Sequence, residues 1–231
     1  MKSYLIIGGS SGMGKSIAEK LSNEGSEVII TYNRTYPDLA DGMRSIQLDA
    51  VSGQLDLSIL PDKLHGLVYC PGRILLKPFP RVTMEEMLED YQVQVMGAFQ
   101  VLQQTAPLLK KGGGGSVVLF STVAVQRGFP FHSVVASSKG AIEGLTRALA
   151  AELAPAIRVN CIAPSISDTP LASRLLDTDE KRQQHAGRHP LKRIGTPGDI
   201  ASLATFLLSE QSSWITGQIL HADGGLSTLV S

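Results

Sequence analysis

The sequence has few cysteines, no excess of either charge and no long apolar run, and each shortage excludes a class of protein. Two cysteines, Cys70 and Cys161, are too few for a disulfide framework, and both lie in apolar runs where buried free thiols are common. Basic and acidic residues are balanced at 21 each, so no net field favours nucleic acid or an anionic membrane. No window approaches the roughly 20 apolar residues of a membrane span, and no signal-peptide pattern opens the chain. We expect a cytoplasmic protein that acts on a small molecule.

Short apolar runs alternate with helical patterns along the chain. The strand-like runs are SYLIIGG, EVIITYN, SIQLDA, GLVYCPG, SVVLFST, IRVNCIAPS and QILHADGG. Continuous apolar strands separated by helices are typical of a parallel sheet buried on both faces. The sequence therefore predicts one α/β domain over residues 1–231, doubly wound, with about seven strands and helices on both faces.

Helix boundaries have recognisable local signals. Helices are expected to begin near Gly12, at Thr83 with Glu86 as a capping box, near Val134, and at Thr196 followed by Pro197. Residues 35–63 show little helical periodicity, which predicts short or irregular crossovers there. The GGGG stretch at 112–115 is expected to be a flexible loop before a strand.

The stretch GGSSGMGKSI, which starts at Gly8, fits two motifs. Both need a strand, a glycine turn and a helix N-terminus, because backbone N–H groups there attract phosphate. In an ATP- or GTP-binding loop, Lys15 would reach the outer phosphates and Ser16 would bind magnesium. In a dinucleotide-binding loop, Gly8 permits the tight turn, Gly12 the approach of the pyrophosphate and Gly14 the packing of helix on strand. A glycine turn without a ligand is the third interpretation.

Several further blocks decide between these motifs. SVVLFST, then ASSKGAIEGLTRALAAELAP, IRVNCIAPSISDTP and WITGQILHADGG, in that order, resemble the short-chain dehydrogenase/reductase family, especially its 3-oxoacyl-carrier-protein reductase-like branch. The resemblance covers nearly the whole chain and is weakest over residues 35–63. It implies a Rossmann-type fold, a nicotinamide dinucleotide and hydride transfer to or from a carbonyl. Ordered blocks are more specific than one glycine pattern, so they favour the dinucleotide.

The end of the second predicted strand indicates which dinucleotide binds. Tyr32 stands where the family places an acid that bonds the ribose of NAD, and Asn33 and Arg34 follow. Because no carboxylate is present to repel a 2′-phosphate, we expect NADP(H) to bind. NAD(H) is the alternative, and in that case Arg34 is a solvated cation of the loop. Asp49 matches the family's adenine-contacting aspartate or closes a turn. The resemblance also implies cofactor contacts at Gly8, Ser10, Ser11, Gly12, Met13, Gly14, Cys70, Pro71, Gly72, Lys139, Pro164 and Thr169.

The catalytic set that the resemblance implies is incomplete. Its members are Asn, Ser, Tyr and Lys, which stabilise and protonate the oxygen that receives charge when a carbonyl is reduced. The YxxxK motif ends at Lys139, and Val135 stands at the position of the tyrosine. Thr122 occupies the position of the serine and keeps a hydroxyl group. Gln94 occupies the position of the asparagine and keeps an amide group. Val135 has no proton to give.

Three hypotheses follow. The protein is an oxidoreductase whose proton comes from Lys139, from His132, from water or from a substrate that needs no acid. Alternatively, it binds NADP(H) without turnover, as a sensor or as the silent partner of an active relative. Phosphate transfer by Lys15 and Ser16 is the third. By resemblance, residues 165–195 form a mobile lid over the substrate, which favours the enzyme because a lid excludes water.

Two further expectations concern metals and assembly. His185 and His189 are spaced for a metal on a helix, but without a third ligand they predict a solvated helix face and no metal site. The helices expected over 83–110 and 134–153 carry more apolar residues than one sheet face needs. By this excess and by resemblance, we expect a homodimer or homotetramer. The examples on the first helix are Met96, Phe99, Val101 and Leu102.

Overall fold

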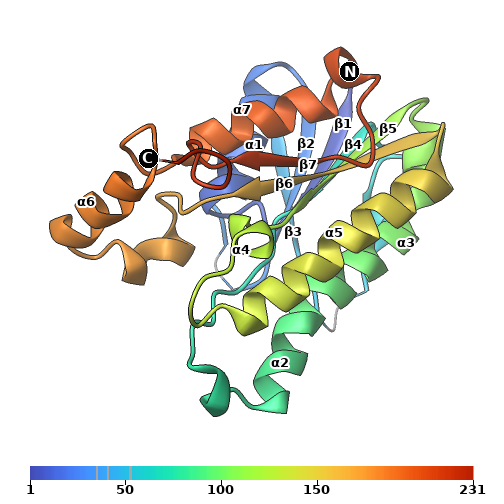
Figure 1. Cartoon of the computed structure of the whole chain (residues 1–231). Coiled ribbons are helices and arrows are strands. Elements are labelled where there is room, and N and C mark those ends of the chain that lie inside the picture. Colours follow the sequence, from blue (N-terminus) through green and yellow to red (C-terminus); the bar gives the residue numbers. More distant parts are fainter. Residues whose placement is uncertain (35, 41, 52–53, 231) are drawn as a thin grey trace.

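The computed structural model describes residues 1–34, 36–40, 42–51 and 54–230. Within these ranges, seven strands form one all-parallel sheet in the order β3-β2-β1-β4-β5-β6-β7 (Figure 1). The order reverses between β1 and β4, where a doubly wound sheet opens a crevice at the carboxyl ends of its strands. The predicted fold class is confirmed. The strands are β1 (Ser3–Ile7), β2 (Glu27–Tyr32), β3 (Met43–Gln47), β4 (Gly66–Tyr69), β5 (Gly115–Phe120), β6 (Ile157–Pro164) and β7 (Ile219–Ala222).

Helices cover both faces of the sheet (Figure 1). On one face lie α1 (Gly12–Asn23) and α7 (Pro197–Leu208), and on the other lie α3 (Gly97–Lys111) and α5 (Ser133–Leu153). None of the helices in the described ranges is long and apolar enough to cross a membrane. The remaining helices and turns are η1 (Leu57–Ile59), η2 (Phe79–Arg81), α2 (Met84–Tyr91), η3 (Gln92–Met96), α4 (Val123–Gln126), η4 (Pro170–Leu175), α6 (Asp179–Arg188) and η5 (Glu210–Ser212).

Each sheet face buries its own apolar core because successive side chains of a strand point to opposite faces. In β1, Ile6 packs with Ile17 of α1, whereas its neighbour Leu5 packs in the core that contains Ile142 of α5. Burying both faces fixes the sheet rigidly between two helical layers. The strand ends that carry the site are positioned by these two cores.

The capping signals located the helix starts correctly. Thr83 accepts a hydrogen bond from the Glu86 backbone N–H at 3.2 Å, and the Glu86 carboxylate accepts one from the Thr83 N–H at 2.9 Å. Such reciprocal bonds satisfy two backbone donors that the helix itself leaves open. The other predicted starts are confirmed at Gly12, one residue early at Ser133, and at Pro197 after the cap Thr196.

The first long helix is interrupted by a turn that the sequence did not predict. Between α2 and α3, η3 is a π-helical turn. Tyr69, at the end of β4, donates its hydroxyl hydrogen to the Val93 carbonyl at 2.5 Å. Gly97 leaves room for this contact, because a Cβ there would lie 2.3 Å from the tyrosine oxygen. The wider turn changes the helical register and carries Gln94 into the interior, where it is 1% exposed.

Other expectations needed correction. The GGGG stretch is a tight turn in which Gly112 caps α3 and Gly115 already begins β5. Val101 and Leu102 are not excess apolar surface, since both are buried in the core, whereas Met96 and Phe99 are exposed.

The crossovers over 35–63 are irregular, as predicted, although residues 35, 41, 52 and 53 lie outside the described ranges.

Candidate active site

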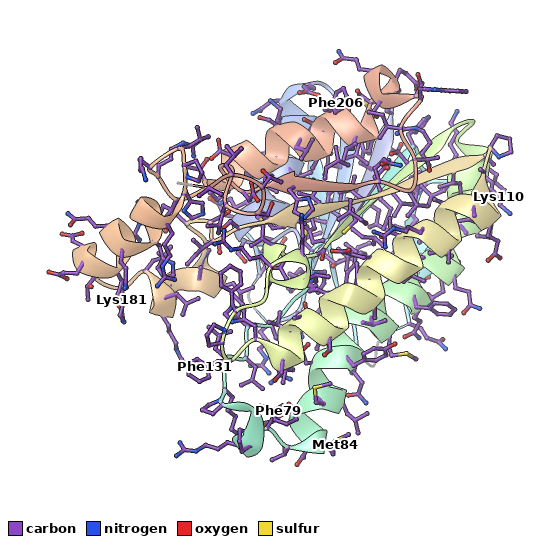
Figure 2. The ribbon with its side chains drawn as sticks, in the orientation of Figure 1. Phe79, Met84, Lys110, Phe131, Lys181 and Phe206 are labelled. Atoms are coloured by element: carbon purple, nitrogen blue, oxygen red, sulfur yellow. The ribbon has the colours of Figure 1, made fainter. Side chains whose placement is uncertain are left out.

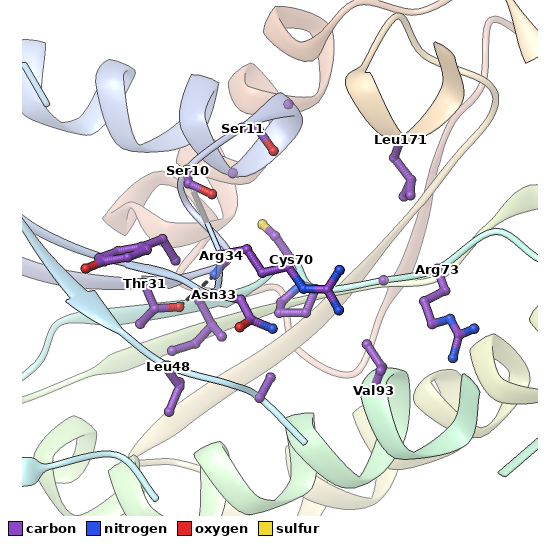
Figure 3. A pocket seen from close by; sticks show the side chains of 18 of the residues that line it. Ser10, Ser11, Thr31, Asn33, Arg34, Leu48, Cys70, Arg73, Val93 and Leu171 are labelled. Carbon is purple, nitrogen blue, oxygen red and sulfur yellow. Dashed lines mark hydrogen bonds between the residues drawn. The ribbon is translucent and has the colours of Figure 1, made fainter. Parts of the chain in front are cut away.

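A cleft of about 870 Å³ opens at the carboxyl ends of β1, β2 and β4, where the strand order reverses (Figure 3). It runs from the glycine loop after β1, past the end of β2, to the segment after β6. The structure thus brings together residues as far apart in the chain as Ile7 and Leu171. Predicted cofactor residues that line the cleft are Gly8, Ser10, Ser11, Gly12, Met13, Gly14, Tyr32, Asn33, Arg34, Asp49, Cys70, Pro71, Gly72 and Thr169.

The glycine loop has the geometry of a dinucleotide cradle. Gly8 has a φ of +74°, and its N–H donates to the Thr31 hydroxyl at 2.9 Å, which ties the loop to β2. A Cβ on Gly14 would lie 2.3 Å from the Gly8 carbonyl oxygen, so only glycine lets α1 pack this closely on the loop. The roles predicted for Gly8 and Gly14 therefore match the backbone.

The N-terminus of α1 is available for a phosphate. Its cap residue, Ser11, makes no side-chain cap hydrogen bond, and the first turn contains no acidic residue. The open N–H groups and the positive end of the helix dipole therefore suit an anion. Lys15 instead lies on the surface of α1, with its amine 3.7 Å from the Glu19 carboxylate, and neither Lys15 nor Ser16 lines the cleft. The loop fits a pyrophosphate and does not fit the ATP- or GTP-binding interpretation.

The ends of β2 and β3 form the far end of the cleft. Figure 3 shows the Arg34 guanidinium directed into the cleft. Tyr32 is held edge-on by Tyr36, with ring centroids 5.3 Å apart. Asp49 accepts a hydrogen bond from the Val51 N–H at 3.0 Å. Since this carboxylate both closes a turn and lines the cleft, its two predicted roles do not exclude each other.

Sequence reasoning missed part of the lining. Many of these residues flank motifs and could have been included by adjacency alone, among them Gln92 and Val93, which directly precede Gln94 at the start of η3. Arg73 follows Gly72 and pairs with Glu89 of α2 at 2.8 Å across the rim. The missed residues are Ile7, Thr31, Leu48, Ala50, Val51, Arg73, Glu89, Gln92, Val93, Pro170 and Leu171.

The predicted catalytic residues are not among those that line the cleft, although the Lys139 amine lies beside Gly72, which does. Thr122 follows β5 and caps α4, accepting a hydrogen bond from the Ala124 N–H at 3.3 Å. Val135 and Lys139 lie one turn apart on α5, and both are buried. Pro164, expected to contact the cofactor, is the last residue of β6 and also lies outside the cleft lining.

Lys139 lies directly behind Gly72. A Cβ on Gly72 would be 3.9 Å from the Lys139 amine and 3.5 Å from the Gln94 side-chain oxygen. Lys139 is 8% exposed, and this burial lowers its pKa to about 8, although Cys161, Asp90 and Cys70 act in the opposite direction. Burial also raises the pKa of both thiols to about 12.

The histidines have structural partners. His132 caps α5 and its Nδ1 lies 2.7 Å from the Pro130 carbonyl oxygen, which matches the interpretation as a loop residue. His189 corrects the expectation of a solvated helix face, because it is 2% exposed. Its Nδ1 contacts the His185 carbonyl oxygen at 2.7 Å and its Nε2 contacts the Ser165 hydroxyl at 2.8 Å. Both ring nitrogens are thus used in anchoring the end of α6.

The segment expected to form a lid projects from the body of the molecule. It comprises η4 and α6, and Figure 1 shows α6 at one side of the sheet, beyond the ends of β6 and β7. Arg182 of α6 binds both carboxylate oxygens of Asp168, at 2.8 and 3.1 Å, and donates to the Leu176 carbonyl. Leu171 of η4 reaches the cleft lining. The segment therefore contributes part of the cleft wall.

Comparison with known proteins identifies the family. A family model described as enoyl-(acyl carrier protein) reductase matches residues 8–227. The chain belongs to the short-chain dehydrogenase/reductase family. A tropinone reductase homologue of Arabidopsis thaliana is 33% identical over 241 residues, which cover 96% of this chain and 92% of the relative.

Solved structures of short-chain dehydrogenase/reductases superpose over the whole chain. The ligand-free aldohexose dehydrogenase of Thermoplasma acidophilum matches with a TM-score of 0.91 and 28% identity, over 99% of this chain and 95% of that one. ElxO with NADP bound matches with a TM-score of 0.90 and 25% identity, over 99% of both chains. The family comprises oxidoreductases that bind NAD or NADP, in agreement with the dinucleotide geometry of the glycine loop.

The burial of Lys139 predicts a pH-dependent stability. In the unfolded chain this lysine keeps its usual pKa of 10.5, whereas in the folded chain the pKa is about 8. Between these pH values the unfolded chain binds more protons, so the free energy of unfolding should rise with pH, by up to about 3 kcal/mol. Lys139→Met should lack this rise. Urea unfolding at several pH values from neutral to 10 measures the difference between the two proteins, and a difference independent of pH would contradict the prediction.

Proposed function

We propose that the protein is an NADP(H)-dependent oxidoreductase that reduces a carbonyl or related small substrate, with Lys139 as the proton donor. The observation that carries the proposal is a buried amine immediately behind Gly72, next to a dinucleotide cradle. When bound, NADPH supplies a hydride to the carbonyl carbon. The residues of the chain must bind the cofactor, orient the substrate and deliver one proton to its oxygen.

The preference for NADP(H) is supported by the end of β2. Tyr32, Asn33 and Arg34 line the cleft and include no carboxylate, so at the end of β2 a 2′-phosphate would meet a guanidinium. ElxO, a structural relative, binds NADP. Charge complementarity therefore favours NADP(H) over NAD(H) at this end of the cleft.

The choice of Lys139 over His132 as donor is supported by their surroundings. A general acid works best when its pKa lies near the working pH, and the pKa of Lys139 is about 8. His132 contacts a backbone carbonyl at the start of α5. Val135, which we infer replaces the family's tyrosine, is 6% exposed and has no proton to transfer. Among these three, the lysine is therefore the donor that we propose.

Val135 also supports a second candidate function. A buried aliphatic side chain at the tyrosine position removes the family's proton donor while Lys139 and the glycine loop remain in place. A protein with this arrangement could bind NADP(H) and turn nothing over, acting as a sensor or as the silent partner of an active relative. Turnover separates the two candidates.

We also propose that the protein forms a homodimer or homotetramer through an outer stripe of apolar side chains. The stripe comprises Met84, Leu88, Tyr91, Met96 and Phe99, which are 39–75% exposed. Figure 2 shows Met84 pointing outward from α2. Their spacing follows one helix face through the π-helical turn, so they form a continuous row rather than scattered residues. A second copy of the chain would cover this row.

Arg34→Ala should weaken NADPH binding and leave NADH binding nearly unchanged. A hydrogen-bonded contact to a charged group contributes about 1.5–3 kcal/mol, which corresponds to a loss of roughly 10- to 100-fold in affinity. Fluorescence titration of both cofactors measures the two dissociation constants. Arg81→Ala, an exposed arginine outside the cleft, is the control. Equal weakening of NADH and NADPH would contradict the assignment of Arg34 to the phosphate.

The main test of the enzyme is NADPH consumption on a panel of ketones and 3-oxoacyl thioesters. We expect the natural protein to turn over at least one of them and Lys139→Met to lose about 10²–10⁴ of the rate, the usual contribution of a general acid. Val135→Tyr should raise the rate on ordinary ketones, and Val135→Phe controls for the added ring. If both the natural protein and Val135→Tyr bind NADPH without turnover, the silent cofactor-binding protein is the better description.

Charging the outer stripe should dissociate the assembly. Leu88→Glu combined with Phe99→Glu places two carboxylates in the middle of the proposed contact, where they would be buried without partners. We expect a monomer by analytical ultracentrifugation, with the secondary structure unchanged by circular dichroism. Leu57→Glu, at another exposed apolar residue, is the control. A natural protein that sediments as a monomer refutes the proposed stripe contact.

A further inference from the structure

Asp90, near the end of α2, is a buried carboxylate that no motif accounts for. It is 1% exposed, and its Oδ2 accepts a hydrogen bond from the Gln94 amide nitrogen at 2.7 Å. Its other oxygen is buried and has no hydrogen-bond partner within the described part of the chain. A buried carboxylate with an open oxygen is costly unless a positive charge lies nearby.

The bond to Asp90 also fixes the orientation of Gln94. An ionised carboxylate only accepts hydrogen bonds, so the glutamine must present its NH₂ group to Asp90 and its carbonyl oxygen elsewhere. That oxygen is buried, again without a partner among the described residues, and it would lie 3.5 Å from a Cβ on Gly72. The Lys139 amine would lie 3.9 Å from the same point. The carboxylate, the amide and the amine therefore form one buried polar cluster behind the cleft wall.

The other titratable groups around Lys139 cannot supply its counter-charge. Cys70, after β4, and Cys161, in β6, act electrostatically on the amine, but burial raises the pKa of both thiols to about 12 and keeps them neutral. Glu143, one turn further on α5, pairs with Arg147 at 3.6 Å and accepts a hydrogen bond from the Ser121 hydroxyl at 2.8 Å. The short α4 and the strand β5 carry no ionisable side chain in VAVQ or GSVVLF.

The other carboxylates of α2 are engaged or lie at the surface. Glu86 pairs with Lys77 at 2.7 Å, and Glu89 pairs with Arg73 at 2.8 Å, both away from the buried cluster. Glu85 is exposed in the first turn of the helix. Asp90 is thus the carboxylate of α2 that acts on Lys139.

We propose that Asp90 is a positioning residue for the proton donor: its carboxylate holds Lys139 in the ammonium form and turns the Gln94 oxygen toward it. The inference rests on the proposed function, in which Lys139 protonates the substrate. During reduction a C–H bond forms at the carbonyl carbon, with the hydride drawn from NADPH. The π electron pair moves to the oxygen, and an N–H bond of Lys139 breaks as the O–H bond forms. The neutral amine then takes a proton from solvent.

The protonation of Lys139 can be measured without cofactor or substrate. We would label lysine with ¹³C at Cε, assign the Lys139 signal by its loss in Lys139→Met, and follow its chemical shift with pH. Asp90→Asn keeps the size of the side chain and removes the charge. We expect it to lower the titration midpoint of Lys139 by about 1–3 pH units, the usual effect of a close opposite charge. Asp90→Glu keeps the charge and should stay nearer the natural midpoint, and Glu85→Gln is the control.

Three outcomes separate the inference from the proposed function. An unchanged midpoint in Asp90→Asn, or an equal fall in Asp90→Glu, overturns the role of Asp90. If the midpoint falls as expected and the alkaline limb of NADPH-dependent activity moves down in pH with it, the inference is supported. A fall in the midpoint with no turnover by the natural protein overturns the proposed function, while the electrostatic effect of Asp90 on Lys139 stands. Circular dichroism and NADPH affinity verify that each variant folds.

Discussion

A buried amine loses the water that stabilises its charge, and the folded chain must replace that water with groups of its own. Lys139 is such an amine, held on α5 where the helix packs against the sheet. Its surroundings determine whether it carries a proton near neutral pH. The two thiols that act on it are neutral, so its ionisation depends on the depth of its burial and on the Asp90 carboxylate. The chemistry of the site follows from this balance.

The balance depends in turn on the π-helical turn. Tyr69 holds the carbonyl of Val93, and Gly97 provides the space for the tyrosine hydroxyl. The extra residue in this turn lets Gln94 face the interior while the outer stripe continues along the opposite side of α2 and α3. One local irregularity therefore serves both the polar cluster and the proposed contact between copies of the chain. An uninterrupted α-helix with the same sequence could not present both faces in this register.

The features predicted correctly from the sequence are those encoded locally. A capping box such as Thr83 with Glu86, or a glycine loop after a β-branched run, depends on residues within a few positions of one another. Asp90 was missed because an acidic residue in a sequence as polar as MEEMLEDY is expected to lie at the surface. Only the packing of α2 against α5 buries it. His189 was misjudged for the same reason, since Ser165, 24 residues earlier, supplies its partner. Long-range burial of polar groups has no local signature.

The projecting segment is built to keep its shape. Arg182 clasps Asp168, and His189 is anchored on Ser165, while Ser167 and Gly195 form an isolated parallel bridge at the base. The segment is also tied to the body of the molecule, because Arg193 pairs with Asp199 of α7 at 2.6 Å and the Leu191 N–H donates to the Gly224 carbonyl at 3.2 Å. A segment braced in this way has already lost most of its conformational entropy on folding, whereas an unbraced loop would have to order residue by residue when a ligand arrives. The wall that it contributes to the cleft is therefore preformed.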